Sequence, residues 1–185
     1  MKRILGIVGS PRKGGNTEVL VGRMLSAARA AGAATDLVRL RDKTIHECQG
    51  CHACWKGRPC VRHDDMNGLY GQLAESDVLV LGTPVYWYGP TALMKAFIDR
   101  LAYFNCPDNR PKIAGKAVAL AVPYEETDPA TAAGVVEFFE KCCKYLQVRL
   151  VGRVIAPGVS EIGDILKHPD RLHEAEALGR RLAGE

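Results

Sequence analysis

Short apolar runs alternate with helical patterns along the chain, and this alternation constrains the fold more than any other feature. The run at 77–82 is almost continuously apolar, as expected for a strand that is covered on both faces. Similar runs predict further strands at 2–8, 35–40, 116–122 and 148–156. Amphipathic patterns predict helices at 16–31, from 64 onward, and at 90–103, 129–146 and 169–182. Strands that alternate with helices favour a parallel sheet with helices on both faces.

Five strands of this kind predict a three-layer, doubly wound α/β fold. Among such folds, five strands favour the flavodoxin-like strand order 2-1-3-4-5. Open α/β sheets bind ligands at the carboxyl ends of their strands, so the loops after the strands form the candidate site. The sequence has no internal repeat, no low-complexity segment and no linker. We therefore predict a single domain over residues 1–185.

The composition excludes several classes of protein. The chain has 185 residues, of which 47% are hydrophobic and 25% charged, with a formal net charge of +4. Lys and Arg are spread along the sequence without a dense basic tract, which argues against a nucleic-acid partner. No apolar stretch approaches the roughly 18 residues that span a bilayer, and the short apolar run near the N-terminus is a buried strand rather than a signal peptide. We predict a cytoplasmic protein with no membrane partner.

The segment at 9–17, between the first strand and the first helix, is a candidate anion site. Its sequence GSPRKGGNT supplies hydroxyl, amide and guanidinium donors, and glycines that let a ligand approach the backbone. The N-terminus of a helix adds free N–H groups and a favourable dipole. The segment matches neither the P-loop nor the Gly-x-Gly-x-x-Gly dinucleotide pattern, which argues against ATP and a Rossmann-type NAD site. The alternative is a polar surface turn capped by Asn16 or Thr17.

A second candidate loop follows the third strand at 83–90, with the sequence TPVYWYGP. Both loops leave the same edge of a parallel sheet. An apolar, aromatic loop can exclude water from one side of a flat ring system. The alternative is a group of core aromatic side chains at the end of a strand.

Four of the seven cysteines follow the compact spacing Cys48-x2-Cys51-x2-Cys54-x5-Cys60 within an aperiodic stretch at about 44–63. Such a cluster in a reducing compartment indicates a metal site before a disulfide framework. The spacing is more similar to iron–sulfur ligation than to a zinc ribbon, whose two knuckles lie farther apart. Three alternatives stay open: a [4Fe–4S] cluster, a single zinc ion with His52 or His63 as a substitute ligand, and a metal-free loop that forms disulfides when oxidised.

The remaining cysteines, Cys106, Cys142 and Cys143, lack such a spacing. The adjacent pair lies on the helical pattern at 129–146, and buried thiols behave as small hydrophobes. We predict structural roles for all three.

These motifs resemble those of a known family. The segment at 9–17 resembles the first FMN loop of the NADPH-dependent FMN reductase-like families, and 83–90 with its continuation LMKAFIDR at 93–100 resembles the second. With the cysteine run, the sequence is most similar to the iron–sulfur flavoproteins within that group. The resemblance covers roughly residues 2–123.

The resemblance implies a set of site residues. Ser10, Arg12, Asn16 and Thr17 would hold the FMN phosphate, and the loop from Pro84 to Gly89 would wrap the isoalloxazine ring. The full predicted FMN set is Ser10, Arg12, Lys13, Gly15, Asn16, Thr17, Pro84, Val85, Tyr86, Trp87, Tyr88, Gly89 and Tyr124. The predicted cluster ligands are Cys48, Cys51, Cys54 and Cys60. The loop at 123–128 departs from the pattern, because it carries three carboxylates where many relatives are rich in glycine.

The function implied is that of an FMN-dependent NAD(P)H oxidoreductase, an iron–sulfur flavoprotein that passes electrons between FMN and a [4Fe–4S] cluster. No side chain is required as an acid or base, because the flavin carries the chemistry. One alternative is an NAD(P)H-dependent flavin or quinone reductase without a cluster, and another is a non-enzymatic electron carrier. The expected partners are NAD(P)H as donor and ferredoxin or a small-molecule acceptor. The resemblance also implies a homodimer or homotetramer.

Overall fold

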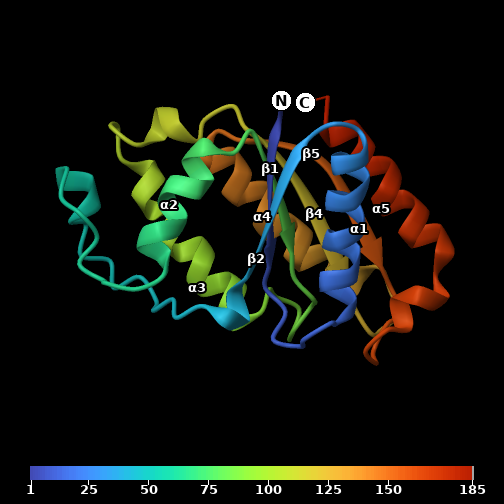
Figure 1. Cartoon of the computed structure of the whole chain (residues 1–185). Helices are drawn as coiled ribbons and strands as arrows, with labels where there is room; N and C mark the ends of the chain where they lie inside the picture. The colour runs from blue at the N-terminus through green and yellow to red at the C-terminus, as the bar shows by residue number, and fades with distance from the viewer. Residues whose placement is uncertain (185) are drawn as a thin grey trace.

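A five-stranded parallel sheet lies between two layers of helices in the computed structural model, which describes residues 1–184 (Figure 1). The strand order is β2-β1-β3-β4-β5, and every neighbouring pair is parallel. The fold class and the strand order predicted from the sequence are therefore confirmed. The strands are β1 (Arg3–Val8), β2 (Ala34–Arg39), β3 (Val78–Gly82), β4 (Ala117–Pro123) and β5 (Arg149–Ala156).

Helices cover both faces of the sheet, with α1 and α5 on one side and α2, α3 and α4 on the other (Figure 1). No helix within residues 1–184 is long and apolar enough to cross a membrane. The helices are α1 (Asn16–Ala30), α2 (Met66–Glu75), α3 (Ala92–Arg100), α4 (Ala130–Leu146) and α5 (Pro169–Leu182). Short 3₁₀ turns lie at Leu40–Asp42, Cys54–Lys56, Leu101–Asn105, Arg110–Lys112 and Asp164–Lys167.

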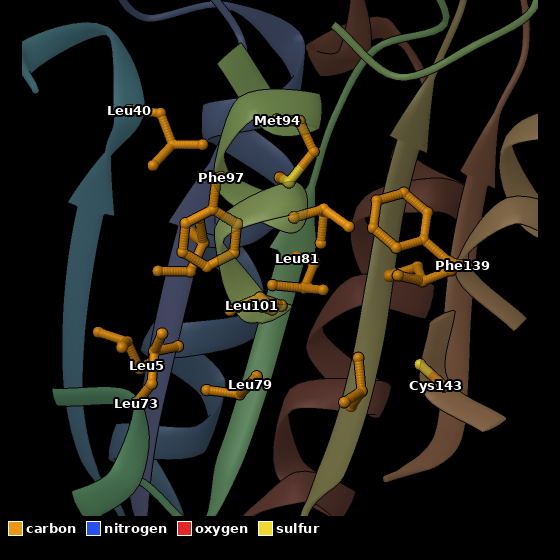
Figure 2. Packing of buried hydrophobic residues seen from close by; sticks show 14 of the residues in the cluster. Leu5, Leu40, Leu73, Leu79, Leu81, Met94, Phe97, Leu101, Phe139 and Cys143 are labelled. Atoms are coloured by element: carbon orange, nitrogen blue, oxygen red, sulfur yellow. The ribbon is translucent and has the colours of Figure 1, made fainter. Parts of the chain in front are cut away.

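The larger apolar layer lies between the sheet and α2, α3 and α4. Figure 2 shows Phe97 of α3 above Leu5, and Phe139 of α4 beside the later strands. Both phenylalanine side chains are fully buried. Burial of each aromatic side chain contributes about 1.5–3 kcal/mol to stability. This layer fixes the helices whose ends reach the candidate sites.

On the opposite face, α5 packs closely against α1. A Cβ at Gly179 would overlap the Met24 backbone, so only glycine allows this approach. The contact holds the C-terminal helix on α1, whose first turn lies at the ligand-binding edge of the sheet.

The start of α3 differs from the prediction, which placed Pro90 in its first turn. The helix begins at Ala92, and Thr91 caps it by accepting a hydrogen bond from the Met94 N–H at 3.1 Å. The Thr91 hydroxyl also donates to the carbonyl of Gly9 at 2.5 Å. The cap therefore ties α3 to the loop that follows β1, a long-range bond that helical periodicity alone does not indicate.

Candidate functional site

A pocket of about 80 Å³ opens at the carboxyl edge of the sheet, where four strand-end loops meet. Loops after β1, β3, β4 and β5 all contribute to its wall. This is the edge at which open α/β sheets bind ligands. The lining residues are Ser10, Arg12, Asn16, Thr17, Pro84, Val85, Tyr86, Pro123, Tyr124, Glu125, Val159 and Ser160.

The anion-binding character of the pocket comes from the start of α1. Its N-cap, Gly15, makes no side-chain cap hydrogen bond, so the first-turn amides lack that partner. Ser10 and Thr17 are buried against the pocket, at 3% and 1% exposed. The helix lies close over β3, because a Cβ at Gly82 would come within 2.5 Å of Val21 Cγ2. Backbone N–H groups and hydroxyls therefore line one end of the pocket.

Glu18, in the first turn of α1, holds the loop that follows β1 in place. Its carboxylate accepts from the Gly14 N–H at 3.0 Å and from the guanidinium groups of Arg39 and Arg41 at 2.6 and 2.8 Å. Burial acts to raise the pKa of Glu18, but the hydrogen bonds from the two arginines outweigh it and leave the pKa lowered. The anionic carboxylate thus fixes the loop before any ligand binds.

Arg12 and Asn16, both predicted to bind the phosphate, make hydrogen bonds to the segment that follows β5. Arg12 donates to the carbonyl of Ser160. The Asn16 amide donates to the Glu161 carbonyl at 2.9 Å and accepts from the N–H groups of Gly163 and Ile165 at 3.1 and 3.2 Å. Since the Asn16 side chain is occupied in this way, the loop offers a ligand mainly Ser10, Thr17, Arg12 and backbone amides.

The loop after β3 forms a tight aromatic hairpin. Tyr86 and Gly89 exchange backbone hydrogen bonds of 2.9 and 3.0 Å, and the two residues between them have positive φ values. Trp87 has φ 48° and Tyr88 φ 60°, a conformation that costs bulky residues about 1–3 kcal/mol each. Both side chains are exposed, Trp87 at 96%. Strain at two exposed aromatic residues indicates a binding role rather than a core role.

A second, open pocket of about 250 Å³ adjoins the first on the hairpin side. It is lined by Val85, Trp87, Tyr88, Glu126 and Thr131, and Val85 belongs to both pockets. The first pocket alone is smaller than the roughly 300–1,000 Å³ of typical ligand sites. The two together offer a polar end and an aromatic end.

Eight of the thirteen predicted FMN residues line the first pocket, and the other five lie around it. Trp87 and Tyr88 face the second pocket, and Lys13 is an exposed residue of the loop after β1. The eight are Ser10, Arg12, Asn16, Thr17, Pro84, Val85, Tyr86 and Tyr124, and the five are Lys13, Gly15, Trp87, Tyr88 and Gly89.

The sequence interpretation did not include Pro123, Val159 or Ser160, which also line the pocket. Val159 and Ser160 follow β5, so the rule that ligands lie beyond the carboxyl ends of strands could have found them. Tyr124 was predicted and is buried, and burial raises the pKa of its phenol. Three acidic residues lie in the loop at 123–128, and one of them, Glu125, lines the pocket. Asp128 lies at the start of α4, where its carboxylate accepts a hydrogen bond from the Ala130 N–H at 2.9 Å.

The cysteine segment leaves the same edge of the sheet after β2 and extends sideways beyond α2 (Figure 1). It wraps a separate pocket of about 90 Å³, several times the roughly 10–15 Å³ that one water molecule needs. All four cysteines of the motif are free thiols. Within residues 1–184, no three His, Cys, Asp or Glu side chains are grouped closely enough to hold one metal ion. The residues that line this pocket and carry polar or sulfur groups are Cys48, Gln49, Cys51, His52, Cys54, Trp55, Cys60, Arg62 and Arg100.

A buried ion pair holds the base of this segment. The Arg100 guanidinium donates to the Asp64 carboxylate at 2.6 and 3.1 Å, and each side chain is only 1% exposed. The His46 backbone joins the pair, because its N–H donates to Asp64 and its carbonyl accepts from Arg100, both at 3.0 Å. Burial acts to raise the pKa of Asp64, but hydrogen bonds from Arg100 and His46 leave the pKa below its usual value.

The thiols of the chain lie in different environments. A backbone hydrogen bond from Ala53 lowers the pKa of Cys51, whereas burial raises the pKa of Cys54. Away from the motif, Cys106 and Cys143 are buried in the core, and burial raises the pKa of Cys143 to about 11. Cys142 is half-buried beside that core. These positions fit the structural roles predicted for the last three.

Helix α3 joins the two pockets. At its first end, the hydroxyl of the cap residue Thr91 donates to the Gly9 carbonyl and accepts from the N–H of Met94 in the first turn. The Thr91 N–H donates to the Thr83 hydroxyl at 3.2 Å, beside the first pocket. Its last residue, Arg100, lines the cysteine pocket. A nine-residue helix rises about 14 Å. Two chemically different sites therefore flank one short helix.

Comparison with known proteins decides the family. The model of the NADPH-dependent FMN reductase family matches residues 2–133. An iron-sulfur flavoprotein from Archaeoglobus fulgidus is 33% identical over 184 residues, covering 98% of this chain and 79% of that protein. The chain belongs to this family of FMN reductases and iron–sulfur flavoproteins. It is therefore an FMN-dependent oxidoreductase, as the sequence predicts.

Other family members and solved structures agree with this assignment. An iron-sulfur flavoprotein from Methanocaldococcus jannaschii is 32% identical over 137 residues, which is 74% of this chain and 71% of that one. The structure of the Trp repressor binding protein from Bacillus subtilis superposes with a TM-score of 0.74 at 23% identity, covering 96% of this chain and 99% of that chain. At that identity the structural match supports the fold alone.

Proposed function

We propose that this FMN-dependent oxidoreductase binds FMN at the carboxyl edge of the sheet, binds a [4Fe–4S] cluster in the cysteine segment, and passes electrons between the two. The observation that carries the proposal is the presence of two chemically distinct pockets at opposite ends of α3. One offers anion donors beside an aromatic hairpin, and the other is lined by four free thiols.

The first pocket has the donor set that a flavin phosphate requires. Ser10, Thr17, Arg12 and the first-turn amides of α1 would hold the phosphate, because anions bind favourably at helix N-termini. The polar pocket of about 80 Å³ suits this end of FMN. The aromatic hairpin and the adjoining pocket of about 250 Å³ would then hold the isoalloxazine ring and exclude water from it.

The cysteine pocket fits an iron–sulfur cluster by the chemistry of its donors. Cys48, Cys51, Cys54 and Cys60 would be the four thiolate ligands, the usual set for a [4Fe–4S] cluster. Arg62 and Arg100, each paired with a carboxylate, place guanidinium N–H groups in the same wall as the thiols. When bound, FMN supplies two-electron chemistry and the cluster supplies one-electron transfer.

The protein's own residues bind, orient and shield these groups. Ser10 and Thr17, both buried, would hold one end of the flavin, and the hairpin at Tyr86–Gly89 would shield its ring. No buried acid or base in the first pocket is required, because proton transfer can proceed through solvent at the open face. The electron donor would be NAD(P)H, and the acceptor a redox protein such as ferredoxin or a small molecule.

The test is anaerobic purification followed by assays of flavin, iron, sulfide and zinc. We expect about one FMN and about four irons and four sulfides per chain. Cys51→Ser is expected to lose iron and keep FMN, while the control Cys106→Ser, which changes a buried thiol outside the pocket, keeps both. Flavin without iron in the wild type would support the alternative of a cluster-free NAD(P)H-dependent reductase. Zinc in place of iron would also contradict the proposal.

A further test separates an enzyme from a carrier. Rapid bleaching of the flavin absorbance by NADH or NADPH is expected for the oxidoreductase. Reduction by a ferredoxin alone, with no response to either nucleotide, would contradict nicotinamide as the donor and favour the electron carrier.

A further inference from the structure

Two buried nitrogen atoms lack any hydrogen-bond partner among residues 1–184, and both belong to the cysteine pocket. They are the Nε atoms of Arg62 and Arg100, whose side chains line that pocket with the four thiols. An unsatisfied buried donor costs about 1–3 kcal/mol, and more when the group is charged. Two such atoms in one wall indicate that the pocket accepts a ligand with hydrogen-bond acceptors.

Three of the other four N–H groups of Arg100 already have partners. Its two Nη atoms bind the Asp64 carboxylate, and Nη1 also donates to the His46 carbonyl. The side chain is 1% exposed and cannot turn toward solvent. These bonds fix the plane of the guanidinium group. The Tyr70 hydroxyl also lies beside this group, but the Nε–H has no hydrogen-bond partner among residues 1–184.

The Arg62 side chain is also held by an ion pair, in this case with Glu47 at the surface of the segment. Its Nη2 pairs with Glu47 at 2.6 Å, and its side chain is 31% exposed while its Nε atom is buried. The exposed ion pair anchors the far end of the side chain. The Nε–H is buried without a partner in a side chain that lines the cysteine pocket.

We propose that the Nε–H groups of Arg62 and Arg100 donate hydrogen bonds to sulfur atoms of the cluster that the four cysteines hold. This inference rests on the proposed cluster and assigns two positioning residues to it. The acceptors would be the sulfides of the cluster and the cysteine thiolates that hold it. The two arginines approach from different parts of the chain, one within the cysteine segment and one from the end of α3.

These hydrogen bonds would set the redox behaviour of the cluster. Hydrogen bonds to sulfur and nearby positive charge stabilise the reduced, more negative form and raise the reduction potential. Loss of one Nε–H is therefore expected to lower the midpoint potential. Since the flavin site shares none of the residues that line this pocket, the flavin potential is expected to stay unchanged.

The experiment measures the cluster midpoint potential by anaerobic redox titration with electron paramagnetic resonance. Arg62→Lys keeps the positive charge and removes the Nε–H, and Arg62→Gln removes both. We expect Arg62→Lys to lower the ratio of reduced to oxidised cluster three- to tenfold at a fixed potential. At 59 mV per tenfold for one electron, this is a shift of about 28–59 mV. Resonance Raman Fe–S stretching bands are expected to shift as well.

The control is Lys43→Gln, which removes an equal charge at an exposed residue just before the cysteine segment and outside the cysteine pocket. Its potential is expected to stay close to that of the wild type. If Arg62→Gln shifts the potential but Arg62→Lys does not, charge rather than the Nε–H bond is responsible and the inference is wrong. Arg100→Lys is a second test, and Arg62 keeps the inference testable if that variant does not fold.

The outcomes also separate this inference from the proposed function. A wild-type protein without iron and sulfide overturns both. An iron-loaded protein whose potential and Raman bands do not respond to Arg62→Lys overturns the hydrogen bonds alone, while the cluster stands.

Discussion

The loop after β1 and the cysteine segment after β2 leave the same edge of the sheet but are held in different ways. The first is short, follows a buried strand and ends directly in α1, so its backbone is fixed by neighbouring elements. The second runs over 43–65 with only one 3₁₀ turn. It is held at its base by the Asp64–Arg100 pair and near its tip by a bond from Trp55 Nε1 to the Ala102 carbonyl at 3.1 Å.

This difference teaches that the two sites depend on different parts of the fold. The proposed flavin site uses loops at the edge of the sheet, and the sheet itself positions these loops. The cysteine site depends on a few long-range polar contacts, so it can be lost while the sheet stays intact. The predictions below test this separation.

The largest effect is expected for Asp64→Asn, which leaves the buried guanidinium of Arg100 without its charged partner. Breaking a buried ion pair in this way costs about 3–5 kcal/mol. Because this pair holds the cysteine segment, the variant is also expected to lose iron while it keeps FMN. Denaturant unfolding gives the free energy, and iron and flavin assays give the occupancy of each site.

The matched control is Asp99→Asn. It removes an exposed ion pair with Lys95 at 2.7 Å on α3, the helix that carries Arg100. Such a pair contributes about 0.3–0.5 kcal/mol. Equal losses of stability in the two variants, or loss of FMN together with iron in Asp64→Asn, would break the proposed separation of the two sites.

Acid is expected to release the same ion pair. The pKa of Asp64 in the folded protein is lowered, whereas an unperturbed Asp has a pKa of about 3.9. The stability that the carboxylate contributes is therefore complete above about pH 4 and is lost as the pH falls through the lower folded pKa. Fluorescence of Trp55 in a Trp87→Phe background reports this step. The same transition in Asp64→Asn would show that another group is responsible.

A smaller effect, confined to the flavin site, is expected for Arg12→Ala. A hydrogen bond from a charged donor contributes about 1.5–3 kcal/mol, so the dissociation constant for FMN is expected to rise about tenfold to a hundredfold. Titration of the apoprotein with FMN measures it. The neighbouring cation Lys13, which does not line the pocket, is the control, and Lys13→Ala is expected to change FMN affinity less than about threefold. Equal affinities for the two variants would remove Arg12 from the phosphate site.

A gain in stability, smaller than the loss expected for Asp64→Asn, is expected in the aromatic hairpin. Replacing Trp87 and Tyr88 by Asn and Gly suits the positive φ values and is expected to raise the free energy of unfolding by about 1–2 kcal/mol. The same change removes the aromatic surface and is expected to weaken FMN binding. A more stable variant with unchanged FMN affinity would show that the hairpin aromatics serve another purpose.

The sheet and the loops that line the first pocket were predictable because local patterns specify them. The continuous apolar run of β3 marks a strand buried on both faces, and the residues after β1 and β3 must meet at one edge of a parallel sheet. The same rule, applied to β5, would have added Val159 and Ser160. The sequence could not show that the Asn16 side chain binds the segment at 161–165, because that partner lies far along the chain.

The cysteine site was predictable only in part. The spacing of the four thiols indicates a common ligand, but nothing local indicates the two arginines in its wall. Arg100 sits in a helical pattern beside apolar residues, where an exposed position for a charge is the usual outcome. Its burial depends on Asp64, which lies 36 residues earlier in the chain. Partners at that distance are set by tertiary packing rather than by local periodicity.

The most direct test of the central claim, two redox centres on one chain, is a stoichiometric reductive titration of the anaerobic protein with dithionite. We expect the wild type to take up about three electrons per chain, two at FMN and one at the cluster. The variant with all four motif cysteines replaced by Ser is expected to take up about two. Uptake of two electrons by the iron-replete wild type, equal to that of the cysteine variant, would contradict the account.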